Sequence, residues 1–225
     1  MTTKSKFAKT RVFLVDDHPI VRRGCQLLIG MEQDIEVCGE ADNGPQALEK
    51  MLKDTPDVAV VDISLKSSTG LDLIKQLRSV CPKVKILVYS MRDESIYAER
   101  ALRAGASGYI TKEEGAEKAI EGIRLLMAGK PCLSDRLTAR FIERMSGYRE
   151  HTKSAIDTLS DRELEVLQLI GEGVATRDLA KRLNVSIKTI ESHRGHIKDK
   201  LGLKTGTELV TYAYKWAQEE GRKSK

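Results

Sequence analysis

The sequence lacks the long apolar segment that a membrane span requires, because none of its apolar runs approaches ~20 residues. After Met1, residues 2–6 are polar or basic and no apolar stretch follows them, so we expect no secretory signal. Cysteine is scarce, and the absence of C-x-x-C spacing favours buried free thiols in a reducing cytoplasm over disulfides or a metal site. The four cysteines are Cys25, Cys38, Cys81 and Cys132. We therefore expect a cytoplasmic protein without membrane contact.

Strong overall charge is also missing, since the net charge is only +5. This value alone does not indicate nucleic-acid binding. The basic residues are unevenly distributed, however, and seven lysines and arginines lie between positions 181 and 204 against two acidic residues. They are Lys181, Arg182, Lys188, Arg194, Lys198, Lys200 and Lys204. The length of 225 residues allows one large domain or two small ones, and this basic cluster marks the C-terminal part as different.

Five short apolar segments alternate with five helical patterns over the first 130 residues. The predicted strands are 11–15, 35–38, 58–61, 84–89 and 108–112. The predicted helices are 20–29, 47–52, 70–80, 94–104 and 114–128. Regular alternation of this kind predicts an α/β fold, a doubly wound five-stranded parallel sheet with helices on both faces.

A carboxylate follows the most apolar of these strands, at Asp62. An uninterrupted apolar run is typical of a strand that is buried on both faces, so the charge must lie where the strand emerges. Other polar residues end the neighbouring strands: Asp16 and Asp17, Ser90, and Lys112. Since the carboxyl ends of parallel strands share one edge of a sheet, we expect these five side chains to form one site.

The residue types at this edge suit phosphoryl transfer. Clustered carboxylates are best reconciled by a hard cation such as Mg²⁺, which also neutralises a phosphoryl group. Asp62 is then a candidate nucleophile, because carboxylates form aspartyl-phosphates. Lys112 would supply a positive charge and Ser90 a hydroxyl donor for the phosphoryl oxygens. His18 also follows the acidic pair, but a lone histidine beside a proline is more typical of a loop residue than of a metal ligand.

The acidic pair, Asp62, Ser90, and Lys112 three residues after Tyr109 together resemble the receiver domain of two-component response regulators. The resemblance implies a flavodoxin-like fold and a sensor histidine kinase that donates the phosphoryl group to Asp62. It also implies Mg²⁺ ligands and two switch residues, Ser90 and Tyr109, that change position on phosphorylation. The implied ligands are Asp16, Asp17, Asp62 and the carbonyl of Ser64. One departure is Lys66-Ser67, where the family often has Pro-Gly.

The C-terminal part restarts after a predicted linker over 131–158, which contains a helix at 134–145 and then a polar tether. Ser160 and Glu163 have capping-box spacing ahead of an apolar helical pattern. A second helix at 176–183, a tight turn and a third helix from Ser186 to Leu201 follow. Helix, short turn and helix predict a small all-α helix-turn-helix domain over 159–225, joined to the domain at 1–130.

The third helix has two faces. One face carries Ile187, Ile190, Ile197 and Leu201, which we expect to pack on the neighbouring helices. On the other face Lys188 is placed to reach guanine or phosphate, and Glu191 to accept from cytosine. Ser192 and Gly195 share this face, and Gly195 either allows close approach to DNA or is simply tolerated. Basic residues around the helix suit phosphate contacts: Lys181, Arg182, Arg194 and Lys198.

The segment from Leu159 to Leu167, together with Lys188-Thr-Ile-Glu-Ser-His193 and Lys200-Leu-Gly202, resembles the LuxR-type helix-turn-helix. A receiver joined to this module resembles the NarL/FixJ-like class of response regulators. The resemblance implies that Lys188, Glu191 and Ser192 read bases of promoter DNA. It also implies a homodimer, with its contact on a fourth helix through Leu209, Val210, Ala213 and Trp216. Arg177 departs from the small polar residue often found there.

Three hypotheses follow from these patterns. The leading one is a transcription regulator, not an enzyme, in which phosphorylation of Asp62 favours receiver dimerisation or release of the DNA-reading module. A second hypothesis is a phosphohydrolase that uses the same nucleophile and metal. A third is a constitutive DNA-binding protein whose first domain serves only for dimerisation.

Overall fold

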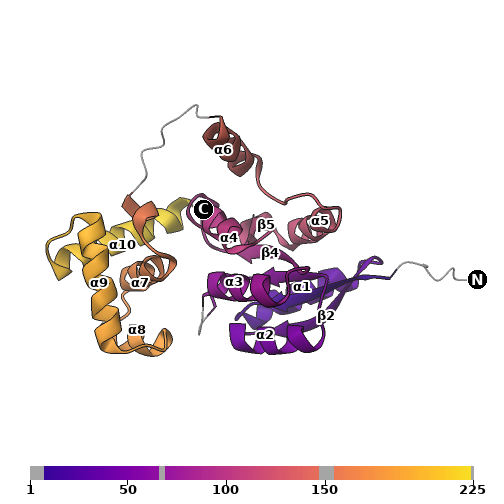
Figure 1. Cartoon of the computed structure of the whole chain (residues 1–225), viewed down its shortest axis with the longest axis horizontal. Coiled ribbons are helices and arrows are strands. Elements are labelled where there is room, and N and C mark those ends of the chain that lie inside the picture. Colours follow the sequence, from indigo (N-terminus) through magenta and orange to yellow (C-terminus); the bar gives the residue numbers. More distant parts are fainter. Residues whose placement is uncertain (1–7, 66–68, 147–154, 224–225) are drawn as a thin grey trace, which may run out of the picture. The chain divides into compact units, whose positions relative to one another are not determined.

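The computed structural model describes residues 8–65, 69–146 and 155–223 (Figure 1). Its internal contacts divide the chain into two compact units, Met1–Thr138 and Ala139–Lys225. This division falls within α6 (Asp135–Met145), which coincides with the helix predicted in the linker. The domain limits predicted from the sequence, at residues 130 and 158, remain predictions.

The first unit is built on a five-stranded sheet. Its strands are β1 (Thr10–Val15), β2 (Ile35–Ala41), β3 (Val58–Val61), β4 (Lys85–Ser90) and β5 (Gly108–Thr111). They run parallel in the order β2-β1-β3-β4-β5, which confirms the predicted sheet. The central strand β3 is fully buried, as its apolar sequence requires.

The strand β2 is longer than predicted. The sequence pattern indicated an end at Cys38, but pairing with β1 continues to Ala41. Gly39 lies opposite Phe13, and the Phe13 ring occupies the space that a side chain at position 39 would need. The ring therefore covers a stretch of strand that contributes little apolar surface of its own.

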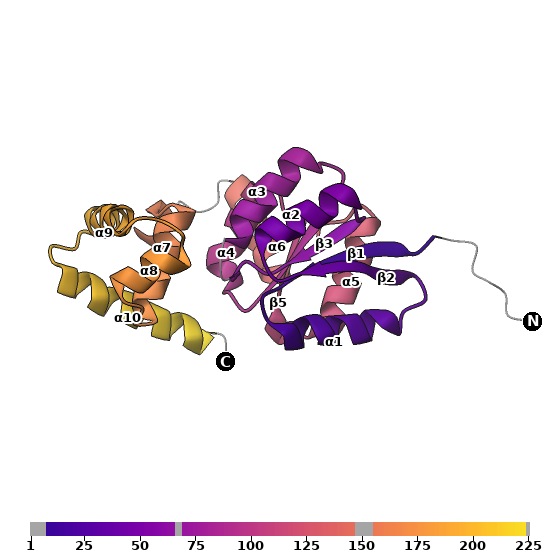
Figure 2. The ribbon, with the colours of Figure 1, turned by 90° about the horizontal axis from the view of Figure 1, so that it is seen from below.

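Helices cover both faces of the sheet, with α1 (Pro19–Gly30) and α5 (Ala116–Met127) on one face. On the opposite face lie α2 (Gly44–Lys53), α3 (Gly70–Val80) and α4 (Glu94–Ala104) (Figure 2). The core under α1 and α5 contains Val12, Leu14, Ile110 and Ile123. Since all five strands run parallel, their carboxyl ends meet at one edge of the sheet.

Local signals in the sequence explain most helix ends. The Asn43 side chain accepts a hydrogen bond from the backbone of Gln46 and caps α2, and Gly105 ends α4 with a φ of 116°.

The prediction that the last strand extends to Lys112 was wrong. The strand β5 ends at Thr111, and Lys112 begins a short 3₁₀ turn, η1 (Lys112–Glu114). Glu114 accepts from the Thr111 backbone and stabilises this turn, so α5 starts two residues later than predicted.

The second unit contains a helix-turn-helix. After η2 (Ala155–Thr158) come α7 (Asp161–Gly171), α8 (Thr176–Arg182), α9 (Ile187–Leu201) and α10 (Gly206–Lys223). Asn184, with a φ of 50°, makes the turn between α8 and α9, and Gly202 ends α9. The predicted capping box at Ser160 and Glu163 is present. Part of the predicted tether, 147–154, lies outside the described residues, and the rest is the turn η2, whose Ile156 is buried.

One packing prediction for this unit, and two of the four residues predicted for the dimer contact, were wrong. Ile187, the first residue of α9, is 51% exposed, whereas Ile190 and Ile197 further along the helix are fully buried. Leu209 and Ala213 on α10 are also fully buried within the unit. They cannot line a surface for a second copy of the chain, although Val210 remains exposed.

The four cysteines are free thiols, as predicted, and three of them are buried. Within the described ranges, no helix is both long and apolar enough to cross a membrane.

Candidate functional site

The carboxyl edge of the sheet brings the predicted polar residues together. Asp16 and Asp17 follow β1, Asp62 follows β3, and Ser90 ends β4. Lys112 reaches the same place from η1, directly after β5. All three carboxylates and the serine are buried, and Asp62 is only 2% exposed. The structure therefore confirms that these five side chains lie together at one edge of the sheet.

Both oxygens of the Asp62 carboxylate have partners. Lys112 Nζ donates to Asp62 Oδ2 at 2.6 Å and to Asp16 Oδ2 at 2.5 Å. On the other side, Ser90 Oγ donates to Asp62 Oδ1 at 2.6 Å, and the backbone amide of Ser64 donates to the same oxygen at 2.9 Å. Three donors, from η1, β4 and the loop after β3, therefore fix the orientation of one carboxylate.

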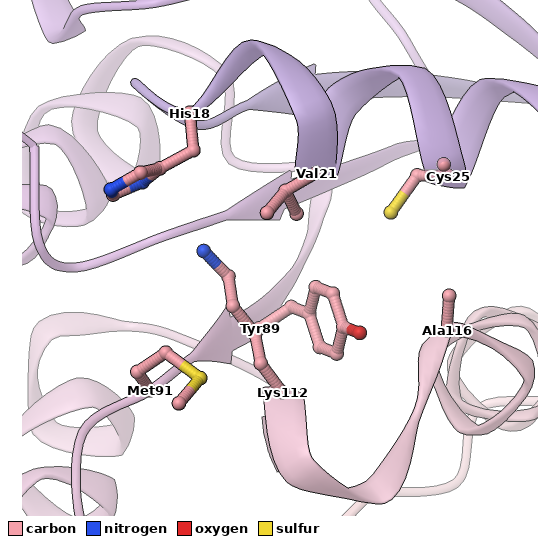
Figure 3. A pocket seen from close by; sticks show the side chains of 8 residues that line it. His18, Val21, Cys25, Tyr89, Met91, Lys112 and Ala116 are labelled. Atoms are coloured by element: carbon pink, nitrogen blue, oxygen red, sulfur yellow. The ribbon is translucent and has the colours of Figure 1, made fainter.

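Lys112 is the buried cation of this edge, and its side chain is only 7% exposed. Burial by itself lowers the pKa of an amine, but the neighbouring Asp62 and Asp16 carboxylates outweigh it and raise the pKa of Lys112 above its usual value. The ammonium group therefore stays protonated and provides a fixed positive charge. Figure 3 shows this side chain pointing towards the segment that carries His18.

A histidine, His18, lies beside the three carboxylates. His18 lies in the loop before α1, as predicted, and its Nδ1 is 2.7 Å from Asp17 Oδ1 and 3.2 Å from Asp16 Oδ1. Ligand atoms of Asp16, Asp17, His18 and Asp62 all lie within 4.8 Å of one another. Three converging carboxylates with one internal ammonium leave an excess of negative charge on hard oxygen donors, so these residues fit a divalent cation.

The loop after β3 presents Asp62 through a close backbone contact with α3. Gly70 donates its amide hydrogen to the carbonyl of Ile63 at 3.2 Å. A Cβ atom at position 70 would lie 2.3 Å from the Asp62 carbonyl oxygen, so only glycine fits there. The predicted role of the Ser64 carbonyl as a metal ligand stays a prediction, and Lys66 and Ser67 lie outside the described residues.

Tyr109 on β5 is 1% exposed, and its hydroxyl donates to the backbone carbonyl of Arg92 at 2.8 Å. Burial raises the pKa of Tyr109 well above its usual value, so the phenol stays a neutral donor. The Arg92 side chain in turn donates through Nε to Ser64 Oγ at 2.8 Å. Sequence analysis missed Arg92, and the available signal was its position two residues after Ser90.

A pocket of about 310 Å³ opens beside this cluster, between α1 and the ends of β4 and β5 (Figure 3). Its walls are mostly apolar, and Lys112 and His18 lie at one end. The lining residues are His18, Val21, Gly24, Cys25, Tyr89, Met91, Lys112 and Ala116.

The predicted DNA-reading residues lie on α8 and α9 of the second unit. Ser186 caps α9 by accepting from the Thr189 amide at 3.0 Å, and the side chains of Lys188, Glu191 and Ser192 behind it are exposed. Lys181 and Arg182 on α8 are exposed as well, and Gly195 and Lys198 are partly exposed.

Arg194 differs from the other basic residues of this face. Its side chain is only 18% exposed, and its Nε lies 3.6 Å from Glu191 Oε2. This pair brings together one residue predicted to contact phosphate and one predicted to read a base, so a base contact by Glu191 competes with the ion pair.

A buried carboxylate joins α7 to the DNA-reading helix. Glu163 Oε2 accepts from the Ser160 amide at 2.7 Å and from Lys200 Nζ at 2.6 Å. Burial alone would raise the pKa of Glu163, but the hydrogen bonds from Lys200 and Ser160 outweigh it and lower the pKa below its usual value. The contact fixes the C-terminal half of α9 against the start of α7.

Comparison with known proteins agrees with both halves of the structure. The family model described as the response regulator receiver domain matches residues 12–124. A second model, described as bacterial regulatory proteins of the luxR family, matches residues 157–213. The chain therefore belongs to the response regulators that combine a receiver with a LuxR-type helix-turn-helix. It is a phosphorylation-dependent, DNA-binding transcription regulator of a two-component system, with DNA and a sensor histidine kinase as partners.

Individual relatives cover almost the whole chain. The oxygen regulatory protein NreC of Staphylococcus haemolyticus is 34% identical over 210 residues, covering 91% of this chain and 97% of that protein. NreC of Staphylococcus aureus is 36% identical with the same coverage. RcsB from Salmonella enterica serovar Typhimurium, solved on the promoters rprA and P1flhDC with the phosphomimetic BeF₃⁻, is 27% identical. The two RcsB structures give TM-scores of 0.65 and 0.67, cover 92% of this chain, and are themselves covered to 99% and 98%.

Proposed function

We propose that Asp62 is the phosphoacceptor of this response regulator. The observation that carries this proposal is the position of the Asp62 carboxylate, between the Lys112 ammonium group on one side and the Ser90 hydroxyl on the other. These two donors are placed to bind phosphoryl oxygens. Asp16, Asp17, Asp62 and the carbonyl of Ser64 would hold Mg²⁺, which, when bound, neutralises the charge of the transferred group.

The proposed transfer is a displacement at phosphorus. An Asp62 oxygen forms the new bond to phosphorus, and the bond between phosphorus and the kinase histidine nitrogen breaks. The electron pair of that bond stays on the histidine. Lys112 stabilises the negative charge of the phosphoryl oxygens and remains protonated throughout. Hydrolysis later returns Asp62 to a carboxylate and releases inorganic phosphate.

Ser90 and Tyr109 are the proposed switch residues. Ser90 Oγ contacts Asp62 directly, so a phosphoryl group on Asp62 changes the partner of this hydroxyl. Tyr109 lies on the neighbouring strand with its hydroxyl held by the segment that follows Ser90. A shift of Ser90 therefore alters the surroundings of Tyr109 and favours a second conformation of the receiver.

The proposed DNA interface is the exposed face of α8 and α9. Lys188, Glu191 and Ser192 would read base edges, and Gly195 would allow close approach to the groove. The proposed phosphate contacts are Lys181, Arg182, Arg194 and Lys198.

We place the protein in the cytoplasm and expect it to act as a homodimer when phosphorylated or bound to promoter DNA.

The test of the acceptor is phosphoryl uptake by Asp62→Asn. The parent protein should acquire an acid-stable, base-labile phosphoryl group from acetyl phosphate and Mg²⁺, and Asp62→Asn should acquire none, because an amide is not a nucleophile here. Asp57→Asn, at the opposite end of the same strand, is the matched control and should be labelled like the parent. Labelling of Asp62→Asn at the parent rate would remove Asp62 from this role.

The same assay addresses the second class of function. We propose that the site turns over no external phosphate ester, so that phosphate release follows only the decay of the Asp62 phosphoryl group. Release of many phosphates per protein during one such lifetime would instead indicate a phosphohydrolase.

A further inference from the structure

Arg92 lies in the connection between β4 and α4, and three of its groups are engaged at the acceptor site. Its backbone carbonyl accepts from the Tyr109 hydroxyl at 2.8 Å. Its Nε donates to Ser64 Oγ at 2.8 Å, and its amide lies 3.4 Å from Ser90 Oγ as a weak donor. One residue therefore contacts the loop after β3, the end of β4 and the tyrosine hydroxyl on β5.

Two of these partners also contact the acceptor carboxylate. Asp62 Oδ1 accepts from the Ser90 hydroxyl at 2.6 Å and from the Ser64 amide at 2.9 Å. Two hydrogen-bonded routes therefore run from Asp62 to Arg92, and Tyr109 is bound to Arg92 at their common end. The side-chain route, through Ser64, is the one that depends on the guanidinium group.

We propose that Arg92 is a positioning residue that links the state of Asp62 to the position of Tyr109 through its hydrogen bond to Ser64. This inference rests on the proposed role of Asp62 as phosphoacceptor. The guanidinium group anchors the β4–α4 connection to the acceptor loop, and this anchor holds the Arg92 carbonyl where the Tyr109 hydroxyl reaches it. A change at Asp62 that moves Ser64 then moves the acceptor of the tyrosine hydroxyl.

The chemistry of the Arg92 guanidinium group and of the Tyr109 hydroxyl supports this link between Asp62 and Tyr109. A guanidinium group is planar and presents donors in fixed directions, so a single bond through Nε constrains the backbone better than a flexible amine does. The buried Tyr109 hydroxyl requires an acceptor, because an unsatisfied buried donor is costly. If the Arg92 carbonyl moves away, the buried position of Tyr109 loses its partner and an outward position becomes populated.

The experiment is a double-mutant cycle with Arg92→Ala, Ser64→Ala and the double variant in the full chain. Fluorine NMR of protein labelled with 3-fluorotyrosine reports each tyrosine, and Tyr109→Phe identifies the signal of Tyr109. In the unphosphorylated protein, we expect each single variant to lower the ratio of buried to outward Tyr109 about fivefold, the effect of one typical hydrogen bond. The double variant should show no further decrease, because both substitutions remove the same bond.

Two further variants separate this role from a general effect of charge. Arg103→Ala removes an exposed arginine of α4 that pairs with Glu99, and should leave the Tyr109 signal unchanged. Arg92→Lys keeps the charge but loses the planar donor, and should behave like Arg92→Ala. A parent-like Tyr109 signal in Arg92→Ala or Arg92→Lys, or additive effects of Arg92→Ala and Ser64→Ala, would overturn the inference.

Phosphoryl uptake from acetyl phosphate and Mg²⁺, measured on the same samples, keeps the two proposals apart. If the parent is not labelled at Asp62, the proposed function fails, whereas the Tyr109 ratio of the unphosphorylated variants still tests the anchor. If the parent is labelled and the variants keep the parent ratio, only the role of Arg92 fails.

Discussion

Lys112 offsets part of the negative charge of the acceptor site. It contacts two buried carboxylates at 2.5 and 2.6 Å, and these charges would otherwise face each other within the protein. Removal of one partner from a buried ion pair leaves an uncompensated charge, which costs far more than the net contribution of the pair itself. The same ammonium group competes with a divalent cation for Asp16 and Asp62.

We therefore predict opposite effects of Lys112→Ala on stability and on metal binding. Without Mg²⁺, the variant should lose about 3 kcal/mol of unfolding free energy, because Asp16 and Asp62 lose their partner. Added Mg²⁺ should stabilise the variant more than the parent, since a cation then replaces the missing charge. Urea unfolding with and without Mg²⁺ measures both effects.

Lys118→Ala is the control, because Lys118 is exposed and pairs with Glu121 on the same helix. It should change neither the stability nor the response to Mg²⁺. Equal stabilisation of the Lys112→Ala variant and the parent by Mg²⁺ would contradict the placement of the cation among these carboxylates.

The residues of the acceptor site differ in how far the sequence predicted them. Asp62, Ser90 and Lys112 were predictable because each lies at or directly after the end of a strand, and the parallel topology brings strand ends together. His18 and Arg92 were not, since their contacts depend on loop conformations that no periodic pattern encodes. Ile187 misled the prediction because helical spacing places a residue on a face without showing how far the neighbouring helices extend.

Elements with strong local signals were predicted almost to the residue. The bounds of α3 and α4 match the predicted ranges, and in each the apolar spacing agrees with a capping residue at the start. The β2 strand was not predicted correctly because it depends on a partner elsewhere in the fold, and the η1 turn because a local side-chain hydrogen bond interrupts the pattern. The Phe13 ring covers Gly39 in β2, and Glu114 reaches back to Thr111 at η1.

The contact between α7 and α9 predicts a dependence of stability on pH. Because the pKa of Glu163 is lowered in the folded protein, its contribution is present above the unfolded pKa of about 4.3 and is lost as the pH falls through the folded value. Lys200→Met should lower the stability of the second unit by about 1 kcal/mol at pH 7 and shift its acid unfolding to higher pH.

Fluorescence of Trp216, the only tryptophan of the chain, reports unfolding of this unit. Lys188→Met, a substitution of an exposed lysine at the other end of α9, should leave the acid midpoint unchanged. An unchanged midpoint in Lys200→Met would show that the Glu163 contact contributes nothing to the position of α9.

The whole molecule combines two units that each have a separate core. Asp62 lies in the first unit, and the exposed face of α9 lies in the second. Regulation therefore requires that a phosphoryl group on one unit changes the DNA affinity of the other, either through dimerisation or through release of the DNA-reading module. A constitutive DNA-binding protein would show no such coupling.

The most direct measurement is the affinity of the full chain for a DNA duplex that the protein itself has selected from a random pool, with and without acetyl phosphate and Mg²⁺. We predict that the phosphodonor tightens binding by the parent protein about tenfold or more, within the usual range of allosteric coupling, and has no effect on Asp62→Asn. Equal affinities of the phosphorylated and unphosphorylated parent, or the same tightening in Asp62→Asn, would contradict the account.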